Sequence, residues 1–99
     1  MIDRKQIAKR VLISSAGPQY DVNVLLDEPR FHAETDTYEC SYRISGQGFD
    51  VTSQTWGVDA FQAIQSALIV IGGEISRIER RTGARLRFGD LDHAGFPLP

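Results

Sequence analysis

The hydrophobic pattern of this chain changes its period once, close to Gly57, and that change limits the folds open to it. Before Gly57, apolar and polar residues alternate, which is typical of strands that are buried on one face. After it, apolar residues recur every three or four positions as far as Ile78, as they do on an amphipathic helix. We therefore expect an α+β fold in which a sheet comes first and one long helix follows.

Four strands are predicted in the first part of the chain, and they are residues 8–15, 20–29, 37–45 and 49–56. The first ends at a Gly17-Pro18 turn, and the second ends at Pro29. We interpret residues 30–36 as a polar connection, and a Gly-Gln-Gly turn joins the last two strands. These short links predict a four-stranded antiparallel β-meander, with Val22, Val24 and Leu26 on one face. Cys40 is expected to be a small buried hydrophobe.

The long C-terminal helix is predicted over residues 59–81. Asp59 suits the N-cap, Gln62 stands where a capping box needs an amide, and Gly83 suits the C-terminal cap. We expect the following stripe to face the sheet: Val58, Phe61, Ile64, Leu68, Ile71, Ile75 and Ile78.

Residues 67–71 are all apolar and cover more than one side of a helix, so we expect Ile69, together with Val70 or Ala63, to point away from the sheet. Either the C-terminal tail or a second chain would then cover them. Gly72 and Gly73 stand within the helix, where each glycine costs about 1 kcal/mol relative to alanine. Close packing, a kink, or the approach of a second helix would each explain them.

The end of the chain is predicted as an extended tail that lies over the core through Leu91 and Phe96, and Leu98 also needs burial. Residues 84–88 leave room for a short fifth strand with Leu86 pointing inward. With 99 residues, the whole chain, 1–99, is expected to be a single domain.

Composition excludes several classes of function. A net charge of -2 does not suggest a nucleic-acid binder, and the single Cys40 excludes a disulfide framework. The N-terminus has no apolar run typical of a signal peptide, which favours the cytoplasm. Gln62, Gln65 and Ser66 interrupt the apolar part of the helix, so we expect no membrane span.

The acidic residues gather in the middle of the chain. Residues 21–59 hold eight acids and only two bases. Within that stretch, acids are interleaved with aromatic residues over residues 26–39. This segment is either a solvated loop or a surface with aromatic anchors that suits a basic protein partner. The predicted contact residues are Asp27, Glu28, Phe31, Glu34, Asp36, Tyr38 and Glu39.

The residues of catalytic type do not form a convincing site. Asp90, Asp92 and His93 are neighbours in the tail, where adjacent side chains point in different directions, so we interpret them as solvated. An enzyme that uses these three is the least favoured reading. We expect no catalytic residue, no metal and no cofactor.

One motif resembles a known family. The pattern Gly57-x-Asp59-x-Phe61-Gln62-Ala63 continues to Ala67-Leu68, and Gly95-Phe96-Pro97 stands near the end. It is similar to that of a family of small bacterial domains of unknown function, over roughly residues 57–97. Some members of that family resemble immunity proteins of contact-dependent or polymorphic toxin systems. No catalytic role comes with the motif, and its residues are interpreted as a cap, a core aromatic, a helix-start amide and a tail anchor.

These observations predict a non-enzymatic cytosolic protein-binding domain. The resemblance favours an immunity protein that binds and neutralises a toxin through its acidic surface, and a nuclease is one such toxin. The alternative is a small homodimeric structural domain that associates through the helix face around Ile69 and Gly73.

Overall fold

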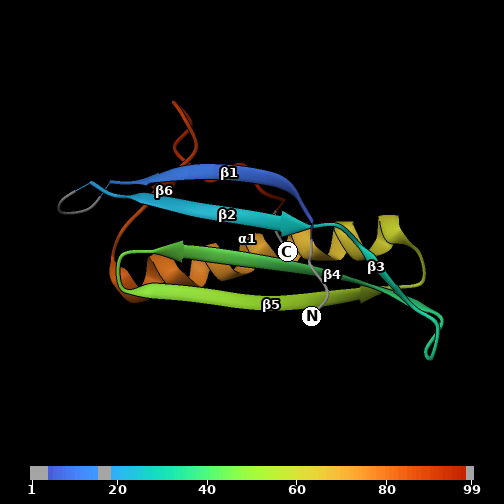
Figure 1. Ribbon diagram of the computed structural model, residues 1–99. Helices are drawn as coiled ribbons and strands as arrows, with labels where there is room; N and C mark the ends of the chain where they lie inside the picture. The colour runs from blue at the N-terminus through green and yellow to red at the C-terminus, as the bar shows by residue number, and fades with distance from the viewer. Residues whose placement is uncertain (1–4, 16–18, 98–99) are drawn as a thin grey trace.

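The computed structural model describes residues 5–15 and 19–97, which form one antiparallel sheet with one helix against its inner face (Figure 1). The elements are β1 (Gln6–Ser14), β2 (Asp21–Asp27), β3 (Arg30–His32), β4 (Thr37–Gly46), β5 (Phe49–Gly57), α1 (Ala60–Thr82) and β6 (Leu86–Arg87). The predicted α+β meander and C-terminal helix are therefore confirmed. The Gly17-Pro18 turn and Leu98 lie outside the described residues.

β4 is the central strand of the sheet. It pairs with β5 along one edge, and with β2 and then β3 along the other. β1 pairs with β2, and β6 adds two residues beside the end of β1. The predicted fifth strand is thus present as β6, and its Leu86 is fully buried.

β3 corrects the prediction that residues 30–36 are only a connection. Proline has no amide hydrogen to donate to a ladder, so pairing stops before Pro29. The chain then rejoins β4, with Arg30 opposite Glu39 and Phe31 opposite Tyr38. A strand of three mostly polar residues is too short to show an alternating pattern.

The inner face of the sheet is buried as predicted. Val22, Val24 and Leu26 of β2 form a core with Ile44 of β4, and Cys40 is also buried. Their alternation along each strand places one row of side chains under the helix and the other row on the outer face.

Both ends of α1 are capped as predicted. Asp59 Oδ1 accepts a hydrogen bond from the Gln62 amide at 2.7 Å, and Gln62 Oε1 accepts one from the Val58 amide at 2.6 Å. Gly83 follows the helix with φ 78° and donates its amide to the Glu79 carbonyl at 2.8 Å. Local sequence therefore determines where this helix begins and ends.

The predicted buried stripe is wrong at the start of the helix. Phe61 is 79% exposed and Val58 is 74% exposed, so Phe61 is not a core aromatic. The residues that face the sheet are Ala63, Ala67, Ile71, Ile75 and Ile78.

The tight link between β5 and α1 explains this difference. A Cβ atom on Gly57 would lie 2.5 Å from the Ala63 nitrogen, so the glycine allows the helix to touch the strand. The Thr55 hydroxyl donates to the Ala63 carbonyl at 2.8 Å. With Ala63 held against the sheet, Phe61 lies about 160° away around the helix and faces solvent.

The tail was predicted correctly for Phe96 and wrongly for Leu91. Phe96 is half-buried against the core, whereas Leu91 is exposed in a turn that its amide closes by donating to the Phe88 carbonyl at 3.1 Å. A Cβ atom on Gly72 would lie 2.5 Å from the Pro97 carbonyl oxygen. Gly72 thus leaves room for the tail, whereas Ile69 remains 42% exposed.

Within residues 5–15 and 19–97, no helix is long and apolar enough to cross a membrane.

Candidate protein-interaction surface

The predicted contact segment folds as the β3–β4 hairpin, which projects at the end of the molecule where α1 begins (Figure 1). Phe31 and Tyr38 are opposite each other in the ladder, and their ring centroids are 5.2 Å apart at an angle of 54°. Phe31 is 53% exposed, while Tyr38 packs against the core. An aromatic side chain that is both accessible and supported from behind is a suitable anchor for a partner.

Two of the predicted acids lie at the tip of this hairpin. Glu34 and Asp36 are exposed in the turn, which the Thr35 amide closes by donating to the His32 carbonyl at 3.3 Å. Asp36 has φ 54°, a left-handed conformation that Asp and Asn adopt more readily than most residues. The turn therefore holds two carboxylates in solvent beside Phe31.

Glu39 faces the other side of the hairpin and is only 7% exposed. Its Oε1 lies 3.3 Å from His32 Nε2, and the His32 ring lies 4.9 Å from the ring of Trp56. Glu39 thus holds the hairpin in place, and it is not an accessible charge for a partner.

Asp27 and Glu28 lie at the root of the hairpin, and both are half-buried. The Asp27 carbonyl accepts a hydrogen bond from the Cys40 thiol, with an S···O distance of 3.6 Å. Burial raises the pKa of this thiol, and the Asp27 and Glu39 carboxylates raise it further.

Asp27 also borders a shallow hollow of about 430 Å³ on the outer face of the sheet, next to Arg43 and Asp50. Arg43 donates to both carboxylate oxygens of Asp50, at 2.9 and 2.7 Å. These hydrogen bonds lower the pKa of Asp50. The ion pair closes one side of the hollow, and both of its charges are satisfied within the chain.

The sequence interpretation missed three apolar residues close to the hairpin, which are Trp56, Val58 and Phe61. Trp56 pairs with Glu39 across the strands, and Val58 and Phe61 follow in the link and the first helical turn. Because Asp59 is the N-cap, Val58 had to lie outside the helix, and this signal was available in the sequence. We call the set Phe31, Glu34, Asp36, Tyr38, Val58 and Phe61 the hairpin surface.

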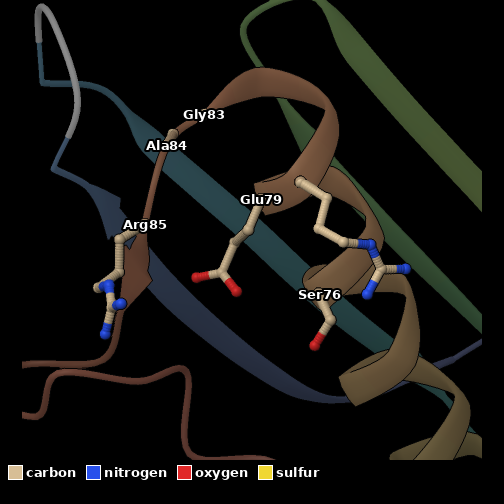
Figure 2. A pocket seen from close by; sticks show the side chains of 6 residues that line it. Ser76, Glu79, Gly83, Ala84 and Arg85 are labelled. Atoms are coloured by element: carbon tan, nitrogen blue, oxygen red, sulfur yellow. The ribbon is translucent and has the colours of Figure 1, made fainter.

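A second hollow, of about 340 Å³, lies at the other end of the helix. Figure 2 shows Ser76 and Glu79 pointing from the last turns of α1 toward the opening, with Arg85 on the segment that follows Gly83. Glu79 Oε2 accepts a hydrogen bond from the Leu86 amide at 2.9 Å. Its carboxylate therefore joins α1 to β6.

Asp90, Asp92 and His93 are all exposed in the tail. His93 Nδ1 accepts from the Gly95 amide at 3.0 Å, and the Asp92 carbonyl accepts from Arg85 at 3.2 Å. These contacts shape the turn of the tail. The described part of the chain contains no group of three or more His, Cys, Asp or Glu residues that could hold a metal ion.

Comparison with known proteins gives one match. The model of a family described as a domain of unknown function, DUF6968, matches residues 8–98. No curated protein and no solved structure matches the chain. The match covers β1 from Ala8 onward, all the later strands, the helix and the tail. The chain therefore belongs to the DUF6968 family.

Proposed function

We propose that this protein is a non-enzymatic binding domain that neutralises a toxin as an immunity protein, through the hairpin surface. The observation that carries the proposal is the combination of exposed apolar side chains and exposed carboxylates at one end of the molecule. Phe31, Val58 and Phe61 are all more than half exposed there, beside Glu34 and Asp36. Large apolar groups rimmed by charge are typical of protein-binding sites.

The chemistry of the surface favours a basic partner. Carboxylates at the rim of an interface attract a basic protein and speed its association, while aromatic anchors slow its dissociation. A nuclease toxin fits this description, because proteins that hold nucleic acid do so with Lys and Arg. The acidic hairpin would then cover the basic surface that the nuclease needs for its substrate.

The test first asks whether a neighbouring gene encodes a toxin that co-purifies with this protein. Binding of that toxin is then measured by surface plasmon resonance at low and high salt. In the test variant, Glu34→Lys is combined with Asp36→Asn, because asparagine suits the left-handed backbone at position 36. We expect slower association and weaker binding, with an effect that shrinks as salt rises.

A matched control changes the net charge by the same amount elsewhere. Asp90→Lys and Asp92→Asn alter exposed residues in the tail. The control should bind like the unmodified protein. Equal losses in the two variants would show that only net charge matters, and an unchanged affinity in the test variant would exclude the hairpin surface.

A further inference from the structure

In the part of the chain that the structure describes, β5 is paired along one side only. It pairs with β4 through every residue from Phe49 to Gly57 without a register shift, and no other strand of the described chain pairs with it. Natural edge strands commonly carry Pro, Lys or a bulge that prevents pairing with another molecule. β5 has none of these, and both carboxylate oxygens of its one charged residue, Asp50, are bonded to Arg43.

The helix also presents an uncovered flank beside this edge. Ala63 lies against Thr55 of β5, whereas Leu68, on the other flank, lines a cleft with Ala8 and Val24. With 100° per residue around the helix axis, the side chain of Val70 points within about 20° of the direction of Ala63. Val70 therefore lies on the β5 side of the helix and projects past that strand. Val70 is 40% exposed. The residues along this flank are Ser66, Val70, Gly73, Glu74 and Arg77, which we call the β5-side ridge.

We propose that two copies of this chain form a dimer by antiparallel pairing of their β5 edges, with the two β5-side ridges packed against each other. Strands in a sheet are about 4.8 Å apart. Because α1 packs over β4 and β5, the two-fold axis would place the two helices about 10 Å apart, which is a normal helix-packing distance. Ser66 and Gly73 are small enough to allow that approach.

Charge favours a second copy over an isolated strand from another protein. In an antiparallel pair of helices, Arg81 near the end of one helix faces the end where Asp59 of the second copy lies, while Arg77 is paired with Glu74 of its own helix at 3.4 Å. Opposite charges, and opposite ends of two helix dipoles, then meet at both ends of the interface. At the strands, a two-fold axis at Ser53 sets Thr52 beside Gln54 of the second copy and brings no like charges together. A lone strand would leave Val70 and Gly73 uncovered.

Analytical ultracentrifugation over a concentration series tests this proposal with Val70→Glu and a closely matched control, Ile69→Glu. The two residues are neighbours and are almost equally exposed, at 40% and 42%, but Ile69 points away from the sheet and from β5. Val70→Glu places two carboxylates close to the axis, and we expect it to raise the dimer Kd by on the order of a hundredfold. Ile69→Glu should leave the dimer Kd unchanged.

Hydrogen exchange on the unmodified protein gives a second measurement that does not depend on any variant. The β5 amides should exchange more slowly at high protein concentration, while the exposed turn at Glu34 should not change. A chain that stays monomeric at every concentration overturns the proposal, and so does a Val70→Glu protein with an unchanged dimer Kd. A dimer that dissociates on Ile69→Glu overturns it as well, because the interface would then be the outer helix face.

Discussion

Cys40 lies on the inner face of β4, where burial raises the pKa of its thiol above the ordinary value of 9.0. A group whose pKa is higher in the folded protein than in the unfolded chain contributes stability below the unfolded pKa. That contribution is lost as the pH rises through the folded pKa. The free energy of unfolding should therefore fall as the pH rises above about 9.

Urea denaturation at a series of pH values measures this effect, and Cys40→Ala is the variant that removes it. The slope of stability against pH should become shallower in Cys40→Ala without vanishing, because burial also raises the pKa of Tyr42. An identical slope in the two proteins would show that the thiol does not ionise in this range.

At the scale of elements, the capping box of α1 gives the next prediction. Asp59→Ala removes the acceptor for the Gln62 amide and should lower the free energy of unfolding by about 1 kcal/mol. Gln62→Ala should cost less, because it leaves only the exposed Val58 amide to water. Gln65→Ala makes the same replacement at another exposed helical position and serves as the control. Thermal denaturation compares the three variants, and a Gln65→Ala loss as large as that of Asp59→Ala would contradict the assignment of the cap.

The sequence predicts some elements better than others. It predicts those that depend on residues close together in the chain, and it misses those that depend on contacts between elements. The cap at Asp59 depends on residues three positions apart, and the buried face of β2 depends on simple alternation, so both were predicted correctly. The orientation of Phe61 depends on the contact between Gly57 and Ala63, which exists only once β5 and α1 meet. β3 exists because β4 is longer than β2 and leaves its first residues free to pair with the chain after Pro29. No pattern within residues 30–32 predicts this pairing.

At the scale of the whole molecule, Arg10 on the inner side of β1 holds that strand to the C-terminal tail. Its guanidinium lies 4.1 Å from the ring centroid of Phe88 and 4.7 Å from that of Phe96. It also donates to the Gly95 carbonyl at 2.9 Å. Contacts between residues so distant in sequence leave no periodic signal. The sequence allowed the Gly-Phe-Pro motif to be interpreted as a tail anchor, but it did not identify Arg10 as the residue that the motif contacts.

A double-mutant cycle with the tail tests the role of Gly72. In the full chain, Gly72→Ala should lower stability, because the new Cβ meets the Pro97 carbonyl oxygen. In a chain that ends at His93, the same substitution should raise stability by up to about 1 kcal/mol, because alanine is the better helix former. Chemical denaturation of the four proteins measures this reversal, and a loss of similar size in both backgrounds would show that the tail is not the cause.

The contact between Arg10 and the tail also has a consequence for the order of folding. Arg10 and Gly95 are 85 residues apart, whereas β4 and β5 are joined by a two-residue turn. Closing a long loop has a large entropic cost, and this cost falls once the contacts inside the loop have formed. We therefore expect the contact between Arg10 and the tail to form late. In a refolding experiment, protection of the β4 and β5 amides should appear first, and protection of the Ser15 amide, which donates to the Arg85 carbonyl 70 residues away, should appear last.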